Sequence, residues 1–250
     1  MSNEAAVRIA VDRRPGHTRI ERLDANRFVR PRAVHAGPDL VRVALVAACA
    51  SLLAGDDVRL EVEVGPGAHL EIIEPSATVA YNGRGGSCRW AAAIRVAEGG
   101  SLVWAGAPLV VSEGADVDRS TTVELADGAV ALHHETLVLG RSGEAGGRLR
   151  ARMRATCEDR PLLVEDVDLG DPGLRRAPGI LGENRVLATT ALLGARPAEP
   201  LHTHETSLAG PGALARSLAN QAHLTDLALA ATRQRWQAVV EDRRLHRSVG

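Results

Sequence analysis

Residues 58–74 read VRLEVEVGPGAHLEIIE, and this stretch decides the fold class. From Val58 to Val64 every second residue is apolar, with arginine and glutamate between them. Strict alternation with a period of two is typical of a half-buried β-strand. The glycines and proline at 65–67 then supply a tight turn, and residues 68–74 carry a second apolar face. The sequence therefore predicts a β-hairpin.

The same succession of strand, glycine turn and strand recurs at residues 92–105 and 121–139. The turn glycines Gly67, Gly99 and Gly128 are separated by 32 and 29 residues. Units repeated at near-constant spacing favour hairpins stacked in a layered or solenoid-like β structure. An ordinary β-sandwich, whose hairpins also recur, is the alternative. Either architecture makes the first half of the chain mainly β.

The second half of the chain begins with strands and ends with helical patterns. Residues 149–156 and 162–169 predict another pair of strands. From 211 to 244 glycine becomes rare, and leucine and alanine recur at helical spacing. This region predicts two helices that break near residues 223–226.

We therefore expect a mainly β protein with hairpins stacked in a β-helix-like or layered architecture. A small pair of helices follows at the C-terminus. The expected organisation is a flexible N-terminus at 1–18, a β-rich domain at 19–205, and a helical region at 206–250 packed on that domain.

The composition excludes several classes of function. The chain has 250 residues and a formal net charge of −1, from 30 basic and 31 acidic side chains. This balance provides no global field that would attract nucleic acid or an anionic membrane. All the basic residues are arginine, so mechanisms that need a P-loop, kinase or Schiff-base lysine are excluded. Aromatic residues make up only 2%, which leaves no row of rings on which bases could stack.

Cysteine usage and hydropathy indicate a cytoplasmic protein. Cys49, Cys88 and Cys157 are odd in number, far apart and without a Cys-x-x-Cys pair, which argues against disulfides or a zinc knuckle. Residues 1–14 contain no apolar signal core, and the longest apolar run is too short to cross a bilayer. We expect no membrane partner.

Two carboxylates fall on apolar strand faces. Glu135 shares a face with Leu137 in residues 129–139, a strand that is apolar on both faces. Glu165 shares a face with Leu163. An unpaired buried carboxylate is costly, so each must be protonated, paired with arginine, or in contact with water or a cation. Pairing with arginine is the common solution. The functional alternative is a polar passage whose ligands hold a divalent metal weakly enough to release it.

A second candidate metal site is formed by His202 and His204. Two histidines two positions apart on a strand share a face and can chelate a transition metal, as in a cupin. A cupin adds a glutamate four residues later, whereas the next acid here is the adjacent Glu205. A polar loop without metal is the alternative.

Short segments of the chain resemble, in order and spacing, the urease accessory protein D family (UreD, called H in some systems). The resemblance extends from about residue 19 to 193. The matching segments are LLAGD at 52–56, GA at 67–68 followed by SATVAY at 76–81, the tryptophan-containing stretch 104–115, ETLVLGR at 135–141 followed by GE at 143–144, and PLLVE at 161–165.

The resemblance implies a scaffold that acts in nickel insertion rather than an enzyme. Members of this family dock on apo-urease, bind accessory protein F and, through it, recruit the GTPase accessory protein G. Their fold is a β-rich stack with a small helical portion, and an internal passage has been proposed as the route of the ion. Because Glu135 and Glu165 fall in matched segments, they are the positions expected to line such a passage and to contact nickel transiently. No tightly bound cofactor is expected.

Three hypotheses follow from the sequence. The first is a non-enzymatic chaperone for nickel delivery to urease. The second is a small cupin-like metalloenzyme that uses His202 and His204. The third is a β-layer binding protein in which Glu135 and Glu165 are simply paired with arginines.

Overall fold

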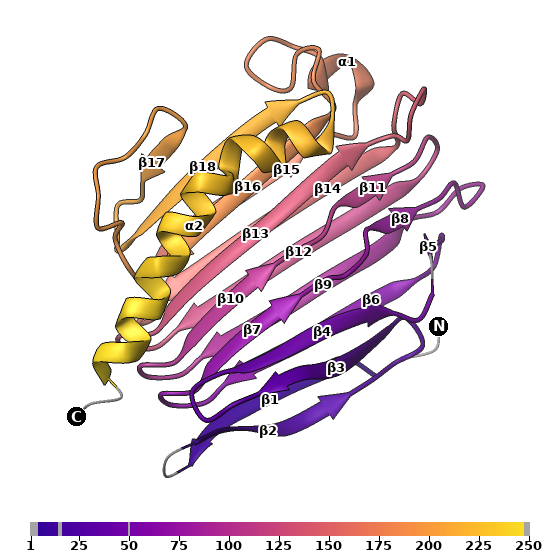
Figure 1. Ribbon diagram of the computed structural model, residues 1–250. Helices are drawn as coiled ribbons and strands as arrows, with labels where there is room; N and C mark the ends of the chain where they lie inside the picture. Colours follow the sequence, from indigo (N-terminus) through magenta and orange to yellow (C-terminus); the bar gives the residue numbers. More distant parts are fainter. Residues whose placement is uncertain (1–4, 15–16, 50, 248–250) are drawn as a thin grey trace.

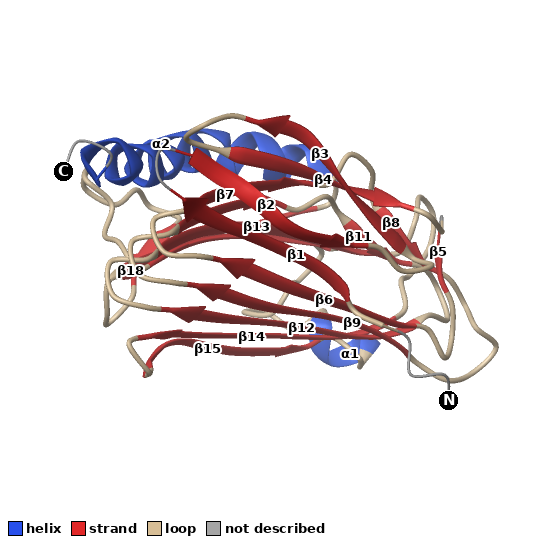
Figure 2. Cartoon of the chain, turned by 90° about the horizontal axis from the view of Figure 1, so that it is seen from below, coloured by secondary structure: helices blue, strands red, loops and turns tan. Residues whose placement is uncertain are grey.

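The chain folds into two β-sheets packed face to face (Figures 1 and 2). The computed structural model describes residues 5–14, 17–49 and 51–247. Sheet A has the order β15 (Arg160–Asp168), β14 (Arg148–Cys157), β12 (Asp116–Leu125), β9 (Cys88–Val96), β6 (Asp57–Val64), β1 (Val7–Arg14) and β2 (His17–Asp24). Sheet B has the order β17 (Glu205–Ser207), β18 (Gly212–Ala219), β16 (Val186–Leu193), β13 (Val130–Leu139), β10 (Ser101–Ala105), β7 (His69–Ile73), β4 (Val41–Ala47) and β3 (Val29–Ala36). The short strands β11 (Leu109–Val111), β8 (Thr78–Ala80) and β5 (Ser51–Leu52) extend it beside β13.

Successive units stack, as the glycine spacing predicts, and the structure shows that their equivalent strands pair in parallel. In sheet A, β6 pairs with β9 and β9 with β12; in sheet B, β7 pairs with β10 and β10 with β13. In both sheets the first step shifts the register by 32 residues and the second by 29. The residues paired across neighbouring strands include Asp57 with Arg89 and Cys88 with Val117 in sheet A. In sheet B they include His69 with Ser101 and Ser101 with Val130. The predicted fold class, a mainly β stack of repeated units, is confirmed.

The pairing inside each unit differs from the predicted hairpin. β6 and β7 do not pair with each other; they lie in opposite sheets, and the turn at 65–67 connects the two layers. The apolar faces of both strands, represented by Leu60 and Leu70, belong to one core cluster. An arch of this kind lets the two apolar faces pack against each other, which a two-stranded hairpin cannot do. Alternation with a period of two is the same in both arrangements, so the sequence alone could not separate them.

The N-terminal segment is a strand, and the prediction of a flexible N-terminus is wrong for the described residues. β1 pairs in parallel with β6 and antiparallel with β2. Val7, Ile9 and Val11 alternate with more exposed residues, and all three are buried. This period-two pattern is visible in the sequence, although the prediction did not use it. Residues 1–4 and 15–16 of the predicted segment lie outside the described part.

The C-terminal region contains a strand and one long helix instead of two helices. Residues 212–219 form β18, which pairs with β16 on one side and β17 on the other. The spacing of Leu214 and Leu218 fits a helix, but pairing with sheet B overrides this local preference. α2 (Ala222–Arg247) is continuous through the predicted break at 223–226. Residues 248–250 lie outside the described part.

α2 covers the outer face of sheet B over β18, β16, β13 and β10 (Figure 2). Leu229, Trp236 and Val240 are buried at this contact, together with Val130 and Leu132 of the sheet. A short helix, α1 (Pro172–Arg175), lies in the connection between β15 and β16. Within the described residues, neither helix has the length and apolar character required to cross a membrane.

Sheet B contains a gap beside β13. Residues 74–77 separate β7 from β8, and residues 106–108 separate β10 from β11, whereas β13 runs past both breaks without interruption. Gly106 lies against the main chain here, because a Cβ at this position would be only 2.5 Å from the carbonyl oxygen of His134. We call residues 74–77 and 106–108 the sheet B gap.

The turn between β16 and the following loop requires glycine at position 194. Gly194 has φ of +81°, and a Cβ there would overlap the carbonyl oxygen of Ala129. We expect Gly194→Ala to lower the free energy of unfolding by about 3 kcal/mol or more, because left-handed backbone strain and steric overlap add. Chemical denaturation measures this change.

Gly143 provides the matched control for that substitution. Its φ is +80°, but no atom lies within 4 Å of the position that a Cβ would occupy. Gly143→Ala should therefore lower the free energy of unfolding by about 1 kcal/mol, from backbone strain alone. Equal losses for the two variants would contradict the close packing at Gly194.

Candidate functional site

Glu135 lies between the two sheets and is paired with an arginine. It projects from β13 toward sheet A, where the Nε of Arg119 on β12 donates a hydrogen bond to it at 2.8 Å. The side chains of Arg119 and Glu135 are 8% and 14% exposed. The Arg119 guanidinium also stacks 3.8 Å from the ring centroid of Trp90. Burial raises the pKa of Glu135, but Arg119 and other neighbours outweigh it and hold the pKa below its usual value.

Glu165 is also paired with an arginine, but here sheet A provides the carboxylate and sheet B the guanidinium. It projects from β15 of sheet A, and the guanidinium of Arg216 on β18 of sheet B donates to its carboxylate. These side chains are 16% and 43% exposed, so this pair lies nearer the edge of the sandwich. Both predicted carboxylates thus have an arginine from the facing sheet, as the third hypothesis requires.

The two ion pairs lie close together and form one polar region. Glu135, Thr189 and Arg216 occupy the same cross-strand row of sheet B. The field of Glu135 partly offsets the lowering of the pKa of Arg216 by burial. In sheet A, Thr121 and Glu165 belong to the row that also includes Met153. We call Arg119, Glu135, Glu165 and Arg216 the inter-sheet charge row.

Next to this row, an inward-facing threonine has an unsatisfied hydroxyl. Thr121 is 3% exposed, and its Oγ1 has no hydrogen-bond partner among the described residues. A buried polar atom without a partner is unusual and points to space for water or another polar group.

A cluster of aromatic and acidic side chains connects the charge row to the sheet B gap. Trp104 packs edge-on against His133, with ring centroids 5.7 Å apart, and its Nε1 donates to Glu74 at 2.8 Å. The main-chain N–H of Ala107, within the gap, donates to the other oxygen of Glu74 at 3.3 Å. Burial raises the pKa of Glu74. A buried carboxyl group therefore lies in the gap between the interior and the outer face of sheet B.

The gap opens into a hollow of about 490 Å³ beneath the start of α2. His134, His223, Asp226 and Arg233 line it together with Glu74. Arg233 donates to the Nε2 of His134 at 3.2 Å and forms an ion pair with Asp226. Polar groups thus extend from the charge row, past Trp104 and Glu74, to the surface beside α2.

Sequence reasoning missed Arg119, Glu74 and His133, although signals for two of them were present. Arg119 occupies an inward position between Val117 and Thr121, so period-two alternation already placed it on the apolar face. Glu74 directly follows β7 and, by period-two alternation with Leu70 and Ile72, falls on the apolar face of that strand. His133 stands beside Glu135 on the same face, but nothing in the sequence indicated its contact with Trp104.

His202 and His204 lie in the segment immediately before β17, close to α2. Their ring centroids are 6.4 Å apart, and the Nε2 of His204 is 3.0 Å from the hydroxyl of Thr232. Glu205 has a fully buried side chain that accepts from Thr232 and pairs with Arg235. Among the described residues, no group of three or more histidine, cysteine, aspartate or glutamate side chains is arranged to hold a metal. The cupin hypothesis therefore has no third ligand in this part of the chain.

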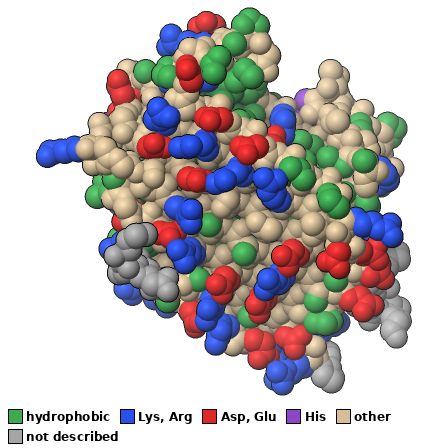
Figure 3. All heavy atoms as spheres, turned by 180° about the vertical axis from the view of Figure 1, so that it is seen from behind, with side chains coloured by type: hydrophobic (Ala, Val, Ile, Leu, Met, Phe, Trp, Pro, Cys, Tyr) green, Lys and Arg blue, Asp and Glu red, His purple; other side chains and the backbone are tan. Residues whose placement is uncertain are grey.

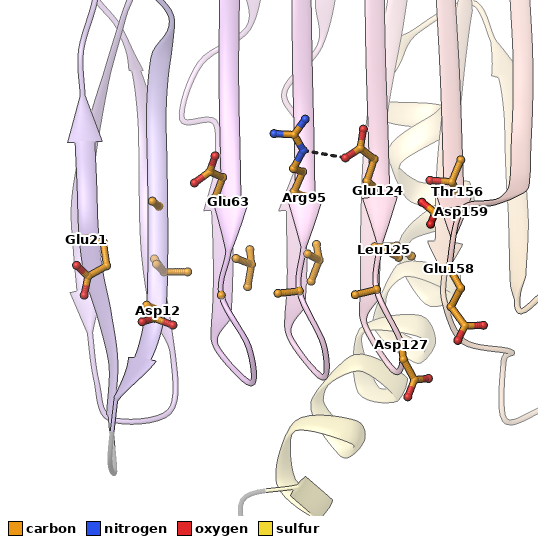
Figure 4. Close-up of a pocket in the computed structure, with 17 residues that line it drawn as sticks. Asp12, Glu21, Glu63, Arg95, Glu124, Leu125, Asp127, Thr156, Glu158 and Asp159 are labelled. Carbon is orange, nitrogen blue, oxygen red and sulfur yellow. Dashed lines mark hydrogen bonds and ion pairs between the residues drawn. The ribbon is translucent and has the colours of Figure 1, made fainter.

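An acidic groove of about 780 Å³ lies where the strands of sheet A end (Figure 4). Its lining includes the apolar residues Val64, Val96 and Leu125, and Arg95 pairs with Glu124 at 2.8 Å. The acidic residues around it are Asp12, Glu21, Glu63, Glu124, Asp127, Glu158 and Asp159. This excess of negative charge makes the local potential attractive to cations and basic surfaces.

The chain matches one family model over almost its whole length. The family is described as UreD urease accessory protein, and the match covers residues 3–247. The chain belongs to the UreD family of urease accessory proteins. The family resemblance inferred from short segments of the sequence is thereby confirmed, and the family is one of urease accessory proteins.

Curated relatives agree with this assignment. A protein of Streptomyces griseus named urease accessory protein UreD 1 is 49% identical over 230 residues, which is 92% of this chain and 90% of the relative. A protein of the same name from Saccharopolyspora erythraea is 39% identical over 74% of each chain. A UreD of Parafrankia is 34% identical over 87% of this chain and 83% of its own length.

Removal of one partner from the Arg119–Glu135 pair should destabilise the fold. We expect Glu135→Ala to lower the free energy of unfolding by about 3–5 kcal/mol, because the buried Arg119 charge would lose its partner. Replacement of both residues by leucine should recover most of this loss, because no charge is then left in the core. Urea denaturation of the three proteins measures these differences.

The half-exposed pair Arg216–Glu165 is the internal comparison. Glu165→Ala should cost about 1 kcal/mol or less, since solvent screens the charge that remains. A loss at Glu165 as large as that at Glu135 would contradict the difference in burial on which the expectation rests.

Three buried histidines should make the stability fall in mild acid. Removal from water, with nearby guanidiniums contributing, lowers the pKa of His69 and His134 to about 4. Burial also lowers the pKa of His133 to about 4, although Glu135 opposes the effect. A histidine with a depressed folded pKa contributes stability above the unfolded pKa near 6.5, and this contribution is lost as the pH falls toward 4.

We expect the free energy of unfolding to fall by up to about 4 kcal/mol per pH unit near pH 5, if all three take up protons on unfolding. His134→Gln should reduce this slope by about 1.4 kcal/mol per pH unit. Urea denaturation between pH 7 and 4.5 measures the slope, with the exposed His17→Gln as the control for substitution. A slope that His134→Gln leaves unchanged would show that this imidazole is already protonated in the folded protein.

Proposed function

We propose that this chain is a chaperone and scaffold for insertion of nickel into apo-urease, acting with urease accessory proteins F and G. The observation that carries this proposal is the family match over residues 3–247, together with relatives named urease accessory proteins. The cell compartment that this role requires is the cytoplasm, where apo-urease and its accessory proteins are assembled.

Energy for metal insertion would come from a partner. The sequence contains no lysine, and a P-loop requires one to contact the β- and γ-phosphates of a nucleotide. GTP hydrolysis is therefore assigned to accessory protein G, and this chain contributes docking and guidance of the ion. No tightly held cofactor is part of the proposal.

The polar region between the sheets supports an internal route for nickel. It begins at the partly exposed pair Arg216–Glu165, continues through Glu135 and reaches Glu74 in the sheet B gap. Thr121, with its unsatisfied hydroxyl, lies along this route. We propose that Glu135 and Glu165 contact the ion in transit.

The arginine pairs explain how such contacts would remain transient. A divalent cation that approaches Glu135 must compete with the Arg119 guanidinium for the same carboxylate oxygen. Competition of this kind lowers the net gain from metal binding, and oxygen ligands hold nickel less tightly than thiolates or several imidazoles would. The arginines that pair with the two carboxylates would thus also favour release of the ion.

Deletion of this chain tests the role itself. In a host that expresses the urease structural subunits with all accessory proteins, removal of this chain should abolish most urease activity and lower the nickel content of purified urease. The chain should also co-purify with accessory proteins F and G. Full activation without it would refute the proposal.

A test of the internal route requires a variant that removes the Glu135 carboxylate without leaving a buried charge. Arg119→Leu with Glu135→Leu meets this condition and should lower nickel transfer to urease several-fold at an unchanged complex yield. The control is Arg8→Gln with Glu61→Gln, a pair of the same kind on the outer face of sheet A, 46% exposed on both sides. Normal activation by the leucine variant would exclude Glu135 from the route while leaving the scaffold role intact.

A further inference from the structure

The outer face of sheet A carries rows of opposite charges (Figure 3). Parallel, in-register strands place arginines beside acids on neighbouring strands, and most of them form ion pairs. These pairs are Arg8–Glu61, Arg95–Glu124, Arg148–Asp116 and Arg152–Asp118, with Arg59–Asp57 along β6 itself. Charge on this face is therefore largely neutralised within the sheet.

At one place on this face two arginines form no ion pair within the described part of the chain, although Arg89 lies in register beside Asp57 and Asp118, and Arg152 lies beside Asp166. A hollow of about 300 Å³ lies there, lined by Ala91 on β9 and by Ser120, Thr121 and Thr122 on β12. Three arginines surround it, Arg89 from β9 and Arg152 and Arg154 from β14, and no carboxylate is among the residues that line it. In the register of the sheet, Ser120 lies beside Arg152 and Thr122 beside Arg154.

Several hydrogen-bond donors without acceptors in the described structure surround the hollow. Among the described residues, neither Arg89 nor Arg154 has a carboxylate within ion-pair distance. Arg152 pairs with Asp118 through its Nη2, but its Nε is buried and has no acceptor in the described part of the chain. The hydroxyl groups of Ser120 and Thr122 add two further donors.

We propose that this hollow, which we call the arginine hollow, binds a phosphate group. Two guanidiniums that have no carboxylate partner in the described chain supply two positive charges, which match the charge of about −1.5 to −2 that a phosphate monoester carries at neutral pH. Guanidiniums recognise phosphate oxygens through paired N–H donors, and the hydroxyls of Ser120 and Thr122 can complete the contacts. Aromatic rings are absent from the lining, so the site recognises the phosphate group and not a nucleotide base.

This site lies on the outer face of sheet A, whereas the proposed route of nickel lies on the inner face; Thr121 lines the hollow, but its side chain is on the inner face. Arg152 and Arg154 point outward from β14, whereas Met153 between them is buried in the core. The two functions can therefore be tested independently, and failure of one leaves the other standing.

Calorimetric titration of the full-length protein with inorganic phosphate tests the proposal. At constant ionic strength we expect saturable binding of one phosphate, stronger at pH 7.5 than at pH 5.5 because the dianion predominates at the higher pH. Arg154→Gln and Arg89→Gln should each weaken binding by about tenfold. Both positions are exposed, so thermal unfolding should change little.

Arg148→Gln is the matched control, because Arg148 lies on the same face of β14 but outside the hollow, near Asp116. It should bind phosphate as the parent protein does. Absence of phosphate binding would overturn the proposal, and so would equal losses in Arg148→Gln and Arg154→Gln, which would indicate general charge screening.

A second titration identifies the source of the phosphate group. A short neutral peptide with one phosphoserine is compared with inorganic phosphate and with the same peptide without phosphate. Tighter binding of the phosphopeptide supports a group presented by a modified protein, and equal affinity supports the free ion. Binding of the unphosphorylated peptide with the same affinity would overturn the proposal.

Discussion

Parallel, in-register stacking of β-arches is the constraint on which the structure depends. Each arch places one strand in each sheet, and every strand must pair with its equivalent in the next unit while its apolar face meets the opposite layer. The register shifts of 32 and 29 residues satisfy both conditions at once, because they are the same in sheet A and sheet B. An insertion within one of these strands would shift its register and turn part of its apolar face toward solvent.

The inter-sheet charge row places polar groups between two sheet faces that are otherwise mainly apolar. Four ionised groups replace apolar contacts between β12, β13, β15 and β18, at a cost in desolvation that hydrophobic side chains would not incur. The two pairs cross in opposite senses, so neither sheet gains net charge from them on its inner face. Each ion pair therefore stabilises the sandwich only while both of its partners are present.

The sequence predicted the stack, the family and the inward carboxylates, for reasons that can be stated in physical terms. Alternation in residues 58–74 and the recurrence of Gly67, Gly99 and Gly128 are local signals, and they fixed the strands and their spacing. Which strands pair is a long-range property, so hairpins and arches could not be separated. The same limit applied to residues 212–219, where leucine spacing suggested a helix but β16 supplies a partner strand.

Candidate site residues were predictable only in part. Glu135 and Glu165 stood out because a carboxylate on an apolar face requires an explanation, and Arg119 would have stood out under the same rule. The identity of each partner depends on how the two sheets face each other, which no spacing rule encodes. The arginine hollow was hidden for a related reason, because its three arginines come from two strands that lie about 60 residues apart in the chain and meet only through β12.

The exclusive use of arginine has a consequence for the charge row. A guanidinium retains its proton at every pH that a cell reaches, whereas a buried lysine could lose its proton and become neutral. Alkaline conditions therefore leave both cationic members of the row charged.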